Sequence, residues 1–306
     1  MIALTSGDPC GIGPEVVLKA FLASPLALRR QLLVIGNLAV FQRTAHHLRL
    51  RLPSWQFVDC PTPGRFTPGK SSRDAGRAAL TYLNTALGLW RAGRISGLVT
   101  APVTKWSVAM AQPGFIGHTE YLAEAMRVRD VAMMFISDRL RVSLVTRHVP
   151  LGRVPQALTS RRLAVTIRLT DAVLAERFRI RRPRLAVCGL NPHAGEAGRC
   201  GSEERDRMIP VLQRLRRDGI RCEGPLAADG LFAGPIPYDA VICAYHDQGL
   251  IPFKALARDR GCQLSAGLPL VRTSPDHGSG LDIAGKGLAH PGSMRYALEL
   301  AARLSR

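Results

Sequence analysis

The segment from Tyr245 to Lys254 places an imidazole, a carboxylate and an ammonium group close together, on His246, Asp247 and Lys254. It directly follows residues 239–244, an apolar run that predicts a buried strand. Ligands bind outside the carboxyl ends of the strands in open α/β sheets. We therefore interpret this segment as catalytic, with Asp247 and Lys254 as candidates for proton transfer.

Two further histidines follow predicted strands in the same way. His148 comes after residues 140–146, and His193 comes after residues 184–190. Neutral imidazole suits zinc and similar divalent ions, and three protein ligands leave a position open for substrate. A lone histidine at the end of a strand is more often a hydrogen-bonded structural residue. The repeated context favours a metal site, but the sequence does not show that the three histidines meet.

The elements that must position these groups alternate along the chain. Strands are predicted near residues 2–5, 32–36, 96–100, 131–136, 140–146, 184–190 and 239–244. Helices are predicted near residues 14–24, 73–92, 160–177, 203–218 and 291–304. This alternation is typical of an α/β protein with a largely parallel sheet.

Composition indicates a globular protein with room for two domains. The chain has 306 residues, of which 46% are hydrophobic, and no apolar stretch approaches the ~20 residues of a membrane span. Because no basic and apolar leader precedes the first strand, we expect a cytoplasmic protein with no membrane partner. The seven cysteines form no Cys-x-x-Cys pair, so we expect neither disulfides nor a cysteine metal site.

The formal charge of +19 raises the alternative of a nucleic-acid-binding protein on a retired enzyme scaffold. However, the arginines are scattered over predicted helix faces, and the densest cluster, residues 177–184, carries one aromatic residue and no recognisable nucleic-acid motif. We therefore expect no nucleic-acid partner. Three of the five lysines, Lys105, Lys254 and Lys286, fall instead within the segments where chemistry is suspected.

Two glycine-rich segments are candidates for nucleotide contact. Residues 5–15 lack the Gly-x-Gly-x-x-Gly spacing of a Rossmann fingerprint, and their two prolines remove amides that would hold a phosphate. Residues 276–287 combine small residues, which allow close backbone approach, with carboxylates that can accept from ribose hydroxyls. The candidate cofactor-binding residues there are Asp276, His277, Gly278, Ser279, Asp282 and Gly285.

Over essentially its full length the chain resembles the 4-hydroxythreonine-4-phosphate dehydrogenase family of the pyridoxal phosphate pathway. The matching blocks are Gly7-Asp8-Pro9 with Gly11-Ile12-Gly13-Pro14, Thr100-Ala101-Pro102 with Lys105, Gly117-His118-Thr119-Glu120, Asn191 to Glu196, Tyr245-His246-Asp247-Gln248, Gly267-Leu268-Pro269, Arg272-Thr273-Ser274 and Asp276-His277-Gly278. Residues 277–287 also look like the adenosine-binding loop of isopropylmalate dehydrogenases.

The resemblance implies an isopropylmalate dehydrogenase-like fold of two α/β/α domains with a cleft between them. We place the first domain at residues 1–130 plus 275–306 and the second, with the metal ligands and the dimer interface, at residues 131–274. The resemblance further implies NAD or NADP as cofactor and a homodimer with a shared active site.

The resemblance also implies roles for single residues. His148, His193 and His246 correspond to the family's ligands for a divalent ion (Zn, Mg or Co), with His246 reaching the ion held by the partner subunit. The implied substrate contacts are His118, Thr119, Lys254, Gln263 and Arg272. Two positions depart from the family pattern, which has Asn at Gln263 and Thr at Gly230.

The implied reaction is oxidation of 4-(phosphooxy)-L-threonine to a β-keto acid that loses carbon dioxide. A divalent ion lowers the pKa of the substrate hydroxyl, and Lys254 or Asp247 takes or relays its proton. The departures at Gln263 and Gly230 leave open a related substrate, either a four-carbon sugar-acid phosphate (threonate or erythronate 4-phosphate) or an aromatic cis-dihydrodiol.

Overall fold

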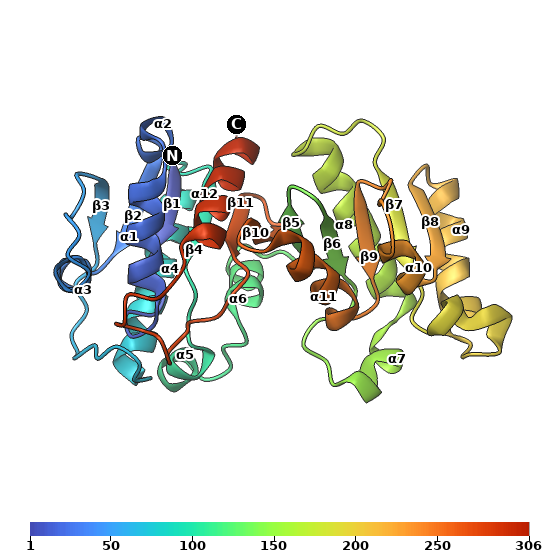
Figure 1. The fold of residues 1–306 in the computed structure, drawn as a ribbon, viewed down its shortest axis with the longest axis horizontal. Coiled ribbons are helices and arrows are strands. Elements are labelled where there is room, and N and C mark those ends of the chain that lie inside the picture. Colours follow the sequence, from blue (N-terminus) through green and yellow to red (C-terminus); the bar gives the residue numbers. More distant parts are fainter. Residues whose placement is uncertain (306) are drawn as a thin grey trace. The chain divides into compact units, whose positions relative to one another are not determined.

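The computed structural model describes residues 1–305 and divides the chain into two compact units (Figure 1). Unit one comprises Met1–Val128, Asp259–Gln263 and the chain from Leu268 onward. Unit two comprises Arg129–Arg258 and Leu264–Gly267. The sequence had placed residues 259–263 and 268–274 in the second domain. They pack in unit one because the strand β11 (Val271–Pro275) pairs in parallel with β4 (Gly97–Thr100).

Unit one is built on a parallel sheet whose strand order reverses in its centre. Successive neighbours in the sheet are β3 (Gln56–Asp59), β2 (Leu32–Gly36), β1 (Ile2–Thr5), β4 and β11. The chain thus leaves β1 in one direction for β2 and β3 and in the other for β4 and β11. Such a switch point is where open α/β sheets bind ligands.

Two groups of helices pack in unit one. The helix α1 (Gly13–Ala23) contacts α3 (Leu38–His47) and α12 (Gly292–Leu304), and α4 (Arg73–Arg91) packs on α5 (Lys105–Ala111). The shorter helices are α2 (Leu26–Arg29) and α6 (His118–Ala125). Ser72 caps α4, since its side chain accepts from the Ala75 amide at 3.1 Å. Buried aromatic side chains such as Tyr82, Phe21 and Phe41 fill the core.

Unit two has a sheet with the order β5 (Ala132–Ser137), β6 (Arg141–Leu144), β9 (Ala240–Cys243), β7 (Arg184–Cys188) and β8 (Arg221–Leu226). Only the β5–β6 pair is antiparallel. The strand β10 (Gly261–Ala266) begins in unit one and ends in unit two.

Both faces of the unit-two sheet are covered, as alternation along β9 shows. Ile242 packs into a core with Leu163 and Ile167 of α8 (Ser160–Glu176). Its neighbour Val241 packs into a second core with Phe253 of α11 (His246–Ala257). Successive residues of a strand point to opposite faces, so unit two has the expected α/β/α layering.

The remaining helical segments of unit two are short. They are Leu151–Arg153, α7 (Val154–Ala157), Pro192–Gly198, Glu204–Met208, α9 (Ile209–Arg217) and α10 (Ala228–Phe232). Among the residues that the structure describes, no helix combines the length and the apolar character needed to cross a membrane.

Candidate active site

Arg272 on β11 is the centre of a buried polar cluster in unit one. Its side chain is 2% exposed, and it donates to the Gln263 Oε1 at 2.8 Å and to the Thr100 hydroxyl at 2.6 Å. The Arg272 nitrogen that donates to Gln263 is Nη1, and the Thr119 hydroxyl lies 3.4 Å from this Nη1. Burial lowers the pKa of Arg272 to about 10, which still leaves the guanidinium charged at neutral pH. The charge of Glu120 acts in the opposite direction and favours the charged guanidinium. A buried cation that is hydrogen-bonded to neutral side-chain oxygens is suited to binding an anion.

His118 begins α6, beside this cluster. Burial lowers the pKa of His118 to about 3, and the charges of Arg272 and Lys105 act in the same direction. The imidazole is therefore neutral at physiological pH and can donate one hydrogen bond to a substrate without adding charge. Thr119, the next residue, is buried at 3% exposure.

Gln263 has its carbonyl oxygen turned toward the arginine. Besides Arg272, the Ser274 hydroxyl donates to this Oε1 at 2.8 Å. The structure thus unites Thr119, Gln263 and Arg272, three of the expected substrate contacts, in one network. Thr100 and Ser274 join that network, and the only signal for them in the sequence was their membership of the matching blocks.

The two glycine-rich segments of unit one contact each other. The Ile12 amide donates to the Ser279 carbonyl at 2.8 Å, and the Thr104 hydroxyl donates to the Ser279 hydroxyl at 2.9 Å. A Cβ at Gly11 would lie 2.8 Å from the Ser279 oxygen, so the close approach requires glycine there. Ser279 and its neighbours are consequently held against the first turn of the chain.

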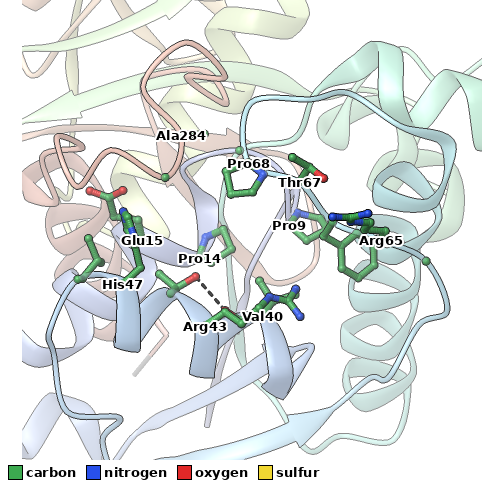
Figure 2. Close-up of a pocket in the computed structure, with 16 residues that line it drawn as sticks. Pro9, Pro14, Glu15, Val40, Arg43, His47, Arg65, Thr67, Pro68 and Ala284 are labelled. Atoms are coloured by element: carbon green, nitrogen blue, oxygen red, sulfur yellow. Dashed lines mark hydrogen bonds between the residues drawn. The ribbon is translucent and has the colours of Figure 1, made fainter.

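Gly285, at the far end of the expected cofactor loop, lines a cavity of about 690 Å³ in unit one (Figure 2). Asp276 is tied to the start of α12, since its carboxylate accepts from the Ser293 hydroxyl at 2.7 Å. His277 places its Nδ1 3.0 Å from the Gly278 carbonyl oxygen. Asp282 is exposed.

In unit two, two of the three candidate metal ligands lie side by side. The ring centroids of His148 and His246 are 5.8 Å apart. The Nδ1 of His246 lies 2.7 Å from the Asp247 Oδ1. A carboxylate that accepts from Nδ1 leaves Nε2 as the nitrogen that can bind a metal. The pairing occurs within one chain, whereas the resemblance implied that His246 serves the partner's ion.

His193 lies on an unusual turn of backbone. Residues 193–197 all have positive φ, with 53° at His193. The buried Glu204 supports this turn from within, because its Oε1 accepts from the amides of Leu190 and Asn191, both at 2.7 Å. Its Oε2 accepts from the Asn191 side chain at 2.9 Å. The sequence analysis did not identify Glu204, because its contacts with Leu190 and Asn191 form only in the folded chain.

His193 and Asp247 line a common hollow of about 570 Å³ in unit two, together with Asp229 and Tyr245. Within residues 1–305, however, the histidines do not assemble with other His, Cys, Asp or Glu side chains into a group of three that could hold a metal. Lys254 lies on α11, exposed, two turns after His246.

The His148–His246 pair fits a metal in its chemistry. With a Zn–N distance of about 2.0–2.1 Å, two imidazoles on one tetrahedral ion have centroids roughly 5–6 Å apart. The observed 5.8 Å agrees with that spacing. The pair and its carboxylate partner therefore suit a divalent ion that favours nitrogen ligands.

A chain that combines two α/β units, a buried arginine suited to an anion and a histidine pair suited to a divalent ion has the features of an enzyme that acts on an anionic substrate. The family model described as pyridoxal phosphate biosynthetic protein PdxA matches residues 20–301. This chain belongs to that family.

Individual relatives agree with this assignment. A 4-hydroxythreonine-4-phosphate dehydrogenase of Paracoccus denitrificans is 42% identical, with 99% of this chain and 98% of that protein covered. The crystal structure of 4-hydroxythreonine-4-phosphate dehydrogenase from Klebsiella pneumoniae matches with a TM-score of 0.89 at 34% identity, covering 100% of this chain and 99% of that one. A terephthalate 1,2-cis-dihydrodiol dehydrogenase from Burkholderia xenovorans matches with a TM-score of 0.67 at 33% identity, over 99% and 97%.

Proposed function

We propose that this chain is a metal-dependent, NAD(P)-linked dehydrogenase of 4-(phosphooxy)-L-threonine. It removes a hydride and a proton from the secondary alcohol to give 2-amino-3-oxo-4-(phosphooxy)butanoate. This β-keto acid loses carbon dioxide and yields 3-amino-2-oxopropyl phosphate, a step of pyridoxine 5'-phosphate biosynthesis. The observation that carries the proposal is the buried, charged Arg272, whose guanidinium is held by hydrogen bonds to Gln263 and Thr100.

The substrate carries two anionic groups, and unit one offers a receptor for one of them. Arg272 is held in place by Gln263 and Thr100 and supplies a fixed positive charge. His118 and Thr119 supply neutral hydrogen bonds, His118 because its pKa is lowered to about 3. Preorganised donors of this kind hold the substrate in one orientation and so lower the entropic part of the barrier.

Unit two offers the groups for the reacting hydroxyl. A divalent ion held by His148, His193 and His246 would lower the pKa of that hydroxyl and make hydride loss to the nicotinamide easier. Asp247 orients His246 through the 2.7 Å contact at Nδ1. Lys254 or Asp247 takes or relays the hydroxyl proton.

One part of this proposal extends beyond a single chain. We include a homodimer with a shared active site, in which His246 reaches the ion held by the partner subunit. The support is that the described residues of one chain do not bring three such side chains together.

A second substrate class has one specific observation in its favour. Gln263 stands in the Arg272 network where the family has Asn. A longer side chain at that position favours a smaller or shifted ligand, such as threonate or erythronate 4-phosphate. The structural similarity to the cis-dihydrodiol dehydrogenase adds an aromatic cis-diol to the substrates worth testing.

A turnover assay tests the proposal directly. Reduction of NAD and NADP is followed with 4-(phosphooxy)-L-threonine, threonate 4-phosphate and an aromatic cis-dihydrodiol, each with and without a chelator. We expect the first substrate to have the highest kcat/KM and the chelator to remove turnover. Turnover that survives complete removal of metal would contradict the role of the histidines.

A further inference from the structure

The cavity in unit one is a candidate binding site that the substrate and metal groups do not use. Its walls come from four segments: the first turn with Pro9 and Pro14, the helix α3, the loop at residues 64–68, and the cofactor loop at Gly285 (Figure 2). Its volume is about 690 Å³, within the range of small-molecule sites. A Cβ at Gly285 would lie 2.8 Å from the Pro68 ring, so the cofactor loop forms one wall directly.

The charged side chains that line this cavity are almost all basic. Arg43 and His47 come from α3, and Arg65 comes from the opposite loop. All three are exposed, and none forms an ion pair with another residue in the described part of the chain, 1–305. The positive charge of the two arginines is therefore available to a ligand.

Glu15, the one carboxylate in the wall, is already engaged. It is 4% exposed, its Oε1 lies 2.7 Å from the Lys19 ammonium, and it accepts from the Ala289 amide at 2.9 Å. The negative charge of Glu15 is thus balanced by Lys19 and does not offset the positive charge of the two arginines. A dianion in the cavity would meet two guanidinium groups without an uncompensated carboxylate.

The rest of the wall suits a flat apolar ring. Pro9, Pro14, Val40, Phe66 and Pro68 contribute apolar surface to the lining, and Thr44 and Thr67 line the cavity as well. An adenine ring can pack on such surface, while a phosphate on the attached ribose needs cations nearby. The combination of an apolar wall and two arginines in the lining fits a phosphorylated adenosine better than an adenosine alone.

We propose that this cavity binds the adenosine end of NADP and that Arg43 and Arg65 select its 2'-phosphate, so that the enzyme prefers NADP to NAD. The inference rests on the proposed function, because it identifies the coenzyme of that reaction. The physical reason is that a guanidinium fork binds a phosphate dianion by charge-assisted hydrogen bonds, whereas the neutral 2'-hydroxyl of NAD gains little from it.

A binding experiment tests the site without any turnover. Calorimetric titration compares 2',5'-ADP with 5'-AMP on the unmodified protein and on Arg43→Gln, Arg65→Gln and the double variant. We expect 2',5'-ADP to bind about 10²-fold more tightly than 5'-AMP. Each single substitution should lower this ratio of affinities about tenfold. The control is Arg94→Gln, which removes the same charge from an exposed position outside the cavity and leaves both affinities unchanged.

Kinetics then separate this inference from the proposed function. The ratio of kcat/KM for NADP to that for NAD should fall about 10²-fold in the double variant and should not change in Arg94→Gln. Equal affinity for 2',5'-ADP and 5'-AMP in the unmodified protein would overturn the inference even if the dehydrogenase reaction is present. A preference for NAD that Asp282→Asn abolishes would overturn it too, since a carboxylate would then select the 2'-hydroxyl. A protein that binds 2',5'-ADP selectively but oxidises none of the tested alcohols would contradict the proposed function alone.

Discussion

The two candidate chemical regions differ in how firmly one chain holds them. In unit one, Arg272 and Thr119 are 2% and 3% exposed, and hydrogen bonds to neighbouring side chains fix the guanidinium. In unit two, the side chains of His246 and Asp247 are 39% and 71% exposed. The anion receptor is therefore preorganised by folding, while the histidine region depends more on what binds to it.

This comparison predicts that the largest losses come from the histidine region, because its chemistry acts on the reacting hydroxyl. Replacement of His246 by Ala should lower kcat by at least about 10³-fold and reduce the metal content measured by elemental analysis. The thermal unfolding midpoint of the metal-free protein should change little, since the ring is part-exposed. Full metal stoichiometry in the triple variant lacking His148, His193 and His246 would contradict the assignment.

Mixed dimers test which subunit supplies each histidine of a site. A heterodimer of His193→Ala and His246→Ala chains should recover activity at one of its two sites if these ligands come from different subunits. A heterodimer of His148→Ala and His246→Ala chains should recover activity as well if His246 crosses to the partner's ion. No recovery in this second mixture, with the heterodimer verified by mass, would mean that His148 and His246, whose ring centroids lie 5.8 Å apart, serve one ion within one chain.

The next largest effect is expected at the preorganised receptor. Arg272→Lys keeps a charge but loses the fork that contacts Gln263 and Thr100. We expect kcat/KM to fall about 10²–10³-fold, mainly through KM for the substrate. Arg94→Gln serves as the surface control. If KM is unchanged and only the unfolding midpoint falls, Arg272 is a structural residue.

Glu204 is a buried side chain that supports the turn carrying the exposed His193, so it combines features of both regions. Glu204→Gln keeps the shape but replaces one acceptor oxygen by a donor facing the amides of Leu190 and Asn191 or the Asn191 side chain. We expect metal affinity to fall about 10–100-fold in a competition titration with a chelating dye. Glu203→Gln, which alters one contact to Asn191, is the matched control and should change affinity less.

The lowered pKa of His118 predicts a pH dependence of stability. Because its pKa is about 3 in the folded chain and about 6.5 when unfolded, the unfolded state binds the proton first as the pH falls. His118 thus makes no destabilising contribution above pH 6.5 and costs up to about 1.4 kcal/mol per pH unit below it. The His118→Asn variant should therefore lose less free energy of unfolding than the unmodified protein between pH 6.5 and 5, as measured by denaturant unfolding. If both proteins lose the same free energy over this range, the His118 ring is solvated in the folded chain.

The sequence predicted the layered α/β fold and seven of the eleven strands in the described residues, because those seven are apolar runs. It missed β11, whose polar residues Arg272, Thr273 and Ser274 are buried, because periodicity does not report burial of polar side chains. It also missed β8, where Gly224 and Pro225 interrupt the pattern. The site residues followed from the matching motifs, whereas the support from Glu204 depends on a contact over 13 residues that only the fold makes.

The smallest expected effect concerns substrate discrimination at Gln263. Its Oε1 accepts from both Arg272 and Ser274, so Gln263→Asn, which is one methylene shorter, must weaken one of these bonds or move Arg272 toward it. Such a shift moves the anion-binding guanidinium relative to the substrate. We expect the ratio of kcat/KM between 4-(phosphooxy)-L-threonine and threonate 4-phosphate to change by up to about tenfold, with less than about 1 kcal/mol lost in unfolding. Ser274→Ala is the informative companion, since it removes the other donor to Oε1 while the length of Gln263 stays the same. If both variants change kcat/KM equally for the two substrates, Gln263 positions Arg272 without contacting the substrate. The Arg272 cluster then distinguishes substrates by their charge alone.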